Sequence, residues 1–388
     1  MRIPDLDKIL SAMLKTYDGI SDLNFSVGHP PQVEDFGELK PVSVDPPIEA
    51  LSTYQTEQIA LTLMQGDRRL MHDYVTGGSC DCSYSLHDEA RFRVNIFRQQ
   101  GHFSVVLRKL QAEVPSIEGL HLPAILHEIA KEKTGLVLMT GATGSGKTTT
   151  LAALLNEINR TQPVHVVTLE DPIEYIHPKL KATINQRELG QDFDNYPNGL
   201  RAALREAPKV ILVGEMRDRD TVEIALTASE TGHLVFSTLH TVDAGQSINR
   251  ILGLFSIGEE KQLRVRLADT LRYVVSQRLA PRVGGGRQLL TEILGHNLRT
   301  QEAIAIGEGE HRSFYEIIEA SSPFGWMTFD QSILAAYEND LITEETAKLF
   351  ASRKGRITRG INLIQKARGV DKDLASGLRL DLPENAFR

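Results

Sequence analysis

The run of small residues at 141–148 is the part of the sequence best suited to chemistry. It reads Gly-Ala-Thr-Gly-Ser-Gly-Lys-Thr and fits G-x-x-x-x-G-K-[ST] without a mismatch, between an apolar stretch (135–140) and a helix-forming stretch (149–159). Glycines let backbone N–H groups wrap closely around phosphate, and the following helix N-terminus adds its positive end. We therefore expect an ATP site in which Lys147 reaches the β- and γ-phosphates and the Thr148 hydroxyl binds Mg²⁺. The candidate binding residues are Gly141, Thr143, Gly144, Ser145, Gly146, Lys147, Thr148 and Thr149.

Carboxylates follow two other apolar runs. The run 210–213 ends in Gly214 and Glu215, and Glu215 is a candidate for orienting or deprotonating the attacking water. The run 164–169 ends in a segment with three carboxylates, 170–174, which Mg²⁺ would stabilise. A solvated loop is the alternative for this second segment.

Histidines and arginines supply further candidates. His233 and His240 flank the predicted strand 234–239, which would keep them roughly 20 Å apart and exclude a shared metal. Structural roles at the two strand ends remain an alternative for them. Arg93 and Arg108, with Arg91 beside them, lie on predicted strands far before the phosphate cradle. They could be ordinary residues of an exposed strand face, or arginine fingers that reach a neighbouring subunit's nucleotide.

The elements before about residue 112 predict a mixed α+β region. Apolar residues between Leu6 and Leu14 recur with helical spacing, and prolines and glycines across 28–47 indicate turns between short strands. A helical stretch is expected around 56–72. The stretches 91–97 and 103–110 have the alternation of a β-hairpin.

The pattern changes after a predicted linker at 113–120. Short apolar runs alternate with helical stretches, as buried parallel strands do, which predicts an α/β domain. We expect this domain to span 121–370 and to be mostly helical from about Gly258 onward. Residues 371–388 are polar and predict a loose tail.

Composition sets outer limits on the function. The 388 residues suggest two domains, and a net charge of -8 argues weakly against a duplex-binding surface. Two cysteines, Cys80 and Cys82, are expected to be reduced thiols and cannot form a four-cysteine zinc cluster. The first ten residues are charged, and no run of 18 apolar residues occurs. We expect a cytoplasmic protein whose membrane link goes through a partner.

Four ordered motifs resemble those of the secretion-superfamily ATPases, and most closely the PilT/PilU twitching-motility ATPases that power type IV pilus retraction. They are 141–148, 170–174 (Glu-Asp-Pro-Ile-Glu), 213–218 (Val-Gly-Glu-Met-Arg-Asp) and 230–241, and the resemblance covers roughly residues 5–350. It implies a PAS-like N-terminal domain, a RecA-like ATPase domain and a homo-hexameric ring at an inner-membrane platform protein. It also implies that Glu174 is the acidic-box carboxylate, Glu215 the Walker B glutamate and His233 with His240 the histidine-box pair. Arg93 and Arg108 would act across a subunit interface.

One segment departs from the retraction pattern. The family usually carries an arginine-containing Ala-Ile-Arg-Asn-Leu-Ile-Arg-Glu-like run after the core, whereas residues 300–308 here lack arginine. This leaves open a primary motor or an accessory one that works with a second retraction ATPase. A RecA-like nucleic-acid motor is a rival that predicts stimulation by DNA. A regulatory subunit without hydrolysis is another, although Lys147, Thr148 and Glu215 are all present.

Overall fold

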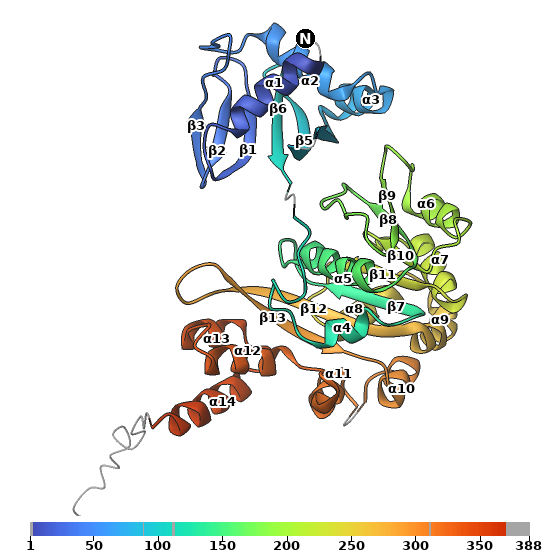
Figure 1. Cartoon of the computed structure of the whole chain (residues 1–388). Coiled ribbons are helices and arrows are strands. Elements are labelled where there is room, and N and C mark those ends of the chain that lie inside the picture. Colours follow the sequence, from blue (N-terminus) through green and yellow to red (C-terminus); the bar gives the residue numbers. More distant parts are fainter. Residues whose placement is uncertain (1–2, 88, 111–112, 310–311, 370–388) are drawn as a thin grey trace, which may run out of the picture. The chain divides into compact units, whose positions relative to one another are not determined.

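The computed structural model describes residues 3–87, 89–110, 113–309 and 312–369 (Figure 1). Two sheets and many helices confirm the predicted mixed α/β class. By its internal contacts the chain divides into two compact units. The first holds the described residues of Met1–Met139, Lys147–Leu239 and Gly253–Arg272, and the second those of Thr140–Gly146, His240–Leu252 and Tyr273–Arg388. The domain limits drawn from the sequence stay predictions, and the expected tail at 371–388 lies outside the described residues.

The N-terminal part of the first unit is a six-stranded antiparallel sheet with the order β3-β2-β1-β6-β5-β4. The predicted hairpin is confirmed, because β5 pairs with β6 and places Arg93 directly opposite Arg108. Three helices accompany this sheet (Figure 1). The elements are α1 (Ile3–Leu14), β1 (Ile20–Phe25), β2 (Gln32–Asp35), β3 (Glu38–Pro41), α2 (Thr53–Met64), α3 (Arg68–Gly77), β4 (Ser79–Leu86), β5 (Ala90–Gln99) and β6 (His102–Lys109).

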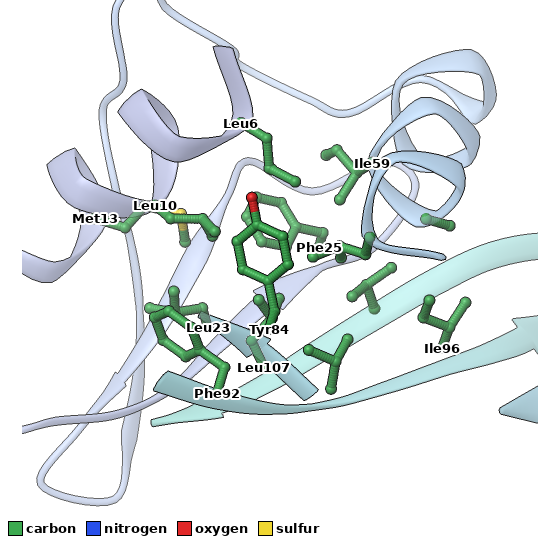
Figure 2. Close-up of a cluster of buried hydrophobic side chains, with 14 of the residues drawn as sticks. Leu6, Leu10, Met13, Leu23, Phe25, Ile59, Tyr84, Phe92, Ile96 and Leu107 are labelled. Carbon is green, nitrogen blue, oxygen red and sulfur yellow. The ribbon is translucent and has the colours of Figure 1, made fainter. Parts of the chain in front are cut away.

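The core of this part lies between helices α1 and α2 and one face of the sheet (Figure 2). The helical stripe predicted from Leu6 and its neighbours supplies buried side chains from α1, and alternate residues of the strands supply the opposite side. The labelled members are Leu6, Leu10, Met13, Leu23, Phe25, Ile59, Tyr84, Phe92, Ile96 and Leu107. The opposite face of β5 carries mostly polar side chains, among them Arg91 and Arg93.

The single helix expected around 56–72 is two helices. Helix α2 ends at Met64; its C-cap Gln65 has a left-handed φ of 50°, and Gly66 follows with a φ of 77°. Asp67 then caps α3, its carboxylate accepting the backbone N–H of Arg69 at 2.7 Å. The glycine and the capping aspartate therefore break the helical run.

The remaining elements of the first unit alternate between strands and helices. The four apolar runs of the sequence are strands β7, β8, β10 and β11, and both β8 and β11 pair in parallel with β10. The polar strand β9, which the sequence analysis missed, pairs in parallel with β8. The elements are α4 (Ile125–Ile129), β7 (Gly135–Thr140), α5 (Lys147–Thr161), β8 (His165–Glu170), β9 (Thr183–Glu188), α6 (Tyr196–Ala203), β10 (Val210–Val213), α7 (Arg219–Glu230), β11 (Leu234–Leu239) and α9 (Ile257–Thr270).

The described residues after Gly258 are mostly helical, as predicted, but they also contain one strand pair that the sequence did not predict. An antiparallel pair of long strands, β12 and β13, precedes the last helices, and the whole second sheet has the order β13-β12-β7-β11-β10-β8-β9. The elements of the second unit are α8 (Ala244–Leu252), β12 (Leu271–Pro281), β13 (Arg287–Leu294), α10 (Leu298–Ile306), α11 (Phe314–Ala320), a 3₁₀ turn (Ser322–Phe324), α12 (Phe329–Glu338), α13 (Glu344–Phe350) and α14 (Lys354–Ala367). Among the described residues, no helix is both long and apolar enough to cross a membrane.

The predicted linker at 113–120 contains no helix or strand, but it is fastened to α5. Asn156 of α5 donates its side-chain amide to the Pro115 carbonyl at 2.9 Å, and Ile117 is buried. His127 lies 3.3 Å from a carboxylate oxygen of Glu157, also on α5. The segment therefore runs along the helix that begins at the phosphate cradle.

Candidate functional site

The loop before α5 has the backbone that a phosphate cradle requires. Gly141, Gly144 and Gly146 have φ values of 143°, 76° and 91°, which disfavour residues with a β-carbon. A β-carbon at Gly141 would also lie 2.5 Å from the Gln277 carbonyl oxygen, so this position admits glycine alone. The buried Ser145 hydroxyl has no hydrogen-bond partner among the described residues. A buried polar atom without a partner is costly, and a bound anion would satisfy it.

A pocket of ≈ 350 Å³ adjoins this loop within the second unit. One wall is the loop itself, and the other comes from β12, the segment before α8 and the end of α13. Its lining mixes apolar side chains with arginines, as expected for an aromatic anion such as a nucleotide. Besides the loop, the lining residues are Val242, Gln277, Arg278, Leu279, Arg287 and Phe350.

The first unit contributes the cation that follows the loop. Lys147 is the first residue of α5 and is only 8% exposed. Burial lowers its pKa below the ordinary value, and the negative charge of Glu215 opposes that shift. Glu215 follows β10 as predicted, and its Oε1 lies 2.7 Å from Nε of Arg217. The structure therefore brings the two strongest sequence candidates of this unit into electrostatic contact.

The acidic segment after β8 has two different kinds of carboxylate. Glu170 is buried and accepts hydrogen bonds from Thr168 at 2.6 Å and Gln186 at 3.0 Å, so it is satisfied by the protein. Glu174 accepts a hydrogen bond from the hydroxyl of Thr148. Burial raises the pKa of Glu174. The hydrogen bond from Thr148 and, separately, the positive charge of Arg93 oppose this rise. Of the segment, Glu174 is thus the member next to the predicted Mg²⁺ ligand, and Tyr175 contacts Thr149 at 3.4 Å.

The two histidines differ in their surroundings. Nδ1 of His233 lies 3.0 Å from the Ala228 carbonyl oxygen, which favours the tautomer that carries the proton on Nδ1. His233 is half-buried, whereas His240 is exposed at the far end of β11. They belong to different units, and their roles in the reaction stay predictions.

The three arginines are also unequal. Arg91 forms an ion pair with Glu188 of the same chain and is largely buried. Arg93 and Arg108 face each other across the β5–β6 pair, with side chains 51% and 70% exposed. Like charges directly opposite each other repel, and a carboxylate lies beside each arginine: Asp22 is 2.9 Å from Arg108. Asp81 is 4.0 Å from Arg93. This exposed pair could bind an anion.

Two residues near the loop were missed in the sequence. Arg278 lines the pocket, and Glu292 lies buried on the neighbouring strand. Their only signal in the sequence is a charged residue inside a stretch of β-forming residues, which reads equally well as a solvated strand face.

Comparison with known proteins gives relatives that extend over most of the chain. Residues 77–315 match the model of the family described as type II/IV secretion system protein. The type IV pilus retraction ATPase PilT of Pseudomonas aeruginosa is 37% identical over 89% of this chain and 97% of its own length. The type IV pilus ATPase PilU of the same organism is 35% identical over 98% of both chains.

Solved structures give the same relationship. A crystal structure of the pilus retraction motor PilT with bound ADP has a TM-score of 0.81 at 37% identity, covering 92% of this chain and 99% of that one. The Legionella pneumophila ATPase DotB has a TM-score of 0.79 at 26% identity, covering 90% of this chain and 95% of that one. The similarity therefore includes the N-terminal part as well as the phosphate-binding loop.

Proposed function

We propose that this chain, which belongs to the type II/IV secretion system family of ATPases, is an ATP-driven motor of type IV pilus retraction. The observation that carries the proposal is the length of the match to PilT and PilU. A shared phosphate loop alone would indicate only nucleotide binding, whereas identity of 35–37% over nearly both whole chains includes the parts that turn hydrolysis into movement.

The binding of ATP and Mg²⁺ is part of this proposal. The glycine conformations and the buried Ser145 hydroxyl fit a phosphate chain, with Lys147 at its β- and γ-phosphates. Thr148 would bind Mg²⁺, and Glu174 would act through its hydrogen bond with Thr148; the ion would neutralise phosphate charge when bound. The pocket beside the loop has room for a base and sugar next to Val242, Arg278 and Phe350. Glu215 would orient the attacking water and accept its proton.

The remaining parts of the proposal concern assembly. A homo-hexameric ring would place Arg93 and Arg108 of one subunit at the nucleotide of the next, and would act on an inner-membrane platform protein from the cytoplasm. A mutually repelling, exposed arginine pair is suited to an anion supplied from outside the subunit. The rival of an accessory motor stays open, because PilU matches as fully as PilT and residues 300–308, on and just after α10, lack the arginines.

Cellular complementation tests the proposed function. In cells that carry type IV pili but lack their retraction ATPases, expression of this chain should restore twitching, and a Lys147→Ala version should not. An accessory motor would restore it only where the primary ATPase is still present. Absence of any effect in both backgrounds, together with strong stimulation of ATP turnover by DNA, would overturn the proposal in favour of a nucleic-acid motor. The net charge of -8 disfavours that outcome.

Mixing of two inactive variants tests whether Arg93 acts across subunits. Arg93→Ala and Glu215→Gln should each be nearly inactive, and co-assembled rings should recover activity. With random mixing, about a quarter of interfaces would pair an intact Glu215 with an intact Arg93 from the neighbour. The measurement is ATP turnover of rings whose mixed composition is confirmed by mass spectrometry.

A role within one chain is the alternative for Arg93, because its charge opposes the burial that raises the pKa of Asp171 and Glu174 in its own chain. In that case no mixed interface is complete, and mixing restores nothing. Arg98→Ala is the matched control, since Arg98 is exposed on the same strand and contacts the Tyr74 ring instead. It should keep wild-type turnover.

A further inference from the structure

A buried glutamate in the second unit has no part in the function proposed so far. Glu292 lies on β13, is only 5% exposed, and pairs in register with Ser276 of β12. Its Oε1 accepts the backbone N–H of Ala244, the first residue of α8, at 3.0 Å. It also accepts the backbone N–H of Phe329, the first residue of α12. One carboxylate therefore satisfies N–H groups at the starts of two helices.

These two helix starts carry walls of the pocket beside the phosphate loop. The segment before α8 contains His240 and Val242, and Val242 lines the pocket. The ring of Phe329 lies 3.7 Å from the guanidinium of Arg278, which lines the same pocket and donates to the Phe350 carbonyl at 3.0 Å. Glu292 thus joins the two sides of the pocket through main-chain hydrogen bonds.

The same strand pair connects Glu292 to the loop. The hydroxyl of Thr140, immediately before Gly141, donates to Ser276 at 2.8 Å in a fully buried contact. Residues directly opposite each other on paired strands point to the same face. Thr140, Ser276 and Glu292 therefore form a buried polar row that runs from the loop to the starts of α8 and α12.

We propose that Glu292 is a positioning residue that holds the Val242 and Arg278 walls of the nucleotide pocket, and the segment of His240, in their working arrangement. This inference rests on the proposed ATP site and deepens it. A neutral side chain could satisfy both N–H groups without the cost of burying charge, so the ionised form needs another reason to be present. That reason is stronger hydrogen bonding to two helix N-termini, each of which carries partial positive charge.

The electrostatic surroundings of Glu292 make its hydrogen bonds to the two helix starts dependent on pH. Burial raises the pKa of Glu292 to about 7, and Asp243 adds to the rise. The N–H groups of Ala244 and Phe329 and the charge of Arg278 oppose it, and Asp330 faces Arg278 from α12. Above pH 7 the carboxylate is ionised and accepts strong hydrogen bonds from the first N–H groups of α8 and α12. Below pH 7 it is protonated, and its hydroxyl oxygen is a poorer acceptor.

The test compares Glu292→Gln with wild-type protein across pH 6 to 8. Wild-type kcat should rise about tenfold with a midpoint near 7, since such a group is about one-tenth ionised at pH 6 and nine-tenths at pH 8. Glu292→Gln should lose this rise. Persistence of the rise in Glu292→Gln would overturn the proposal and assign it to other groups, such as the histidines. Asp330→Asn is the matched control, because Asp330 is a buried carboxylate that accepts backbone N–H groups of Ser352 and Arg353, and it should keep the rise.

A thermal measurement without nucleotide separates this inference from the proposed function. A carboxyl whose folded pKa is raised stabilises the fold less as pH increases from its unfolded value to about 7. The melting temperature of Glu292→Gln relative to wild type should therefore rise by at least about 3 °C between pH 5 and pH 8. If wild type hydrolysed no ATP but this shift appeared, the proposed function would fail while the burial and titration of Glu292 stood. A constant difference across pH would reject the titration and with it the positioning role.

Discussion

Lys147→Ala should reduce ATP turnover by at least about a hundredfold while the subunits still assemble. Removal of one group that stabilises charge in the transition state costs about 10²–10³ in kcat, and this ammonium is both buried and the first side chain after the cradle. Coupled-enzyme assays measure turnover, and light scattering measures the mass of the assembly. Turnover within tenfold of wild type would reject the cradle assignment.

Two controls separate loss of phosphate binding from loss of the fold. Burial lowers the pKa of Lys147, which means that the charged side chain lowers the stability of the folded protein. Without nucleotide, Lys147→Ala should therefore melt no lower than wild type. The rise in melting temperature that ATP gives to wild type should be absent in the variant. Lys133→Ala is the matched control, because Lys133 is an exposed lysine that contacts Gln162 at the opposite end of α5. It should behave as wild type.

The sequence predicted the strands whose signal is local. Runs such as Leu136 to Met139 are apolar throughout, because both faces of these strands are buried. The missed strands carry polar residues in buried positions. In β12 and β13, Ser276, Gln277 and Glu292 are buried, so neither an apolar run nor a clean alternation marks them. Their burial depends on partners far away in the chain, which no local pattern reveals.

The candidate site also contains residues that a local sequence pattern predicts and residues whose roles depend on distant partners. The phosphate loop could be predicted because a backbone that wraps an anion requires glycines at fixed spacings. Glu170 and Glu174 look alike in the sequence, yet Glu170 is satisfied by Thr168 and Gln186, while Glu174 contacts Thr148. Only the pairing of β8 with β9, which brings Gln186 alongside, distinguishes them. Glu292 has no distinguishing signal in the sequence, because its partners are main-chain N–H groups of two distant helices.

Glu215→Gln should bind ATP normally and turn it over at least about a hundredfold more slowly, the usual effect of losing a group that accepts the proton of the attacking water. The backbone around Glu215 is fixed on both sides. The Gly214 N–H donates to the Leu169 carbonyl at 2.8 Å, and the Thr238 hydroxyl donates to the Gly214 carbonyl at 2.6 Å. The glutamine should therefore occupy the same place with the same shape, and only the charge and basicity change.

Two further variants identify the cause of that loss. Arg217→Ala removes the ion-pair partner of Glu215. The Arg217 side chain is 73% exposed, and exposed ion pairs contribute little, so turnover should change less than about threefold. A large loss there would mean that the ion pair, not proton transfer, explains the Glu215→Gln result.

Glu174→Gln tests the other carboxylate. If Glu174 is a positioning residue that acts through Thr148 and Mg²⁺, its loss should raise the Mg²⁺ concentration needed for half-maximal turnover, whereas Glu215→Gln should leave that requirement unchanged. Near-normal turnover of Glu215→Gln, together with a dead Glu174→Gln whose Mg²⁺ requirement is unaltered, would transfer the role of base to Glu174.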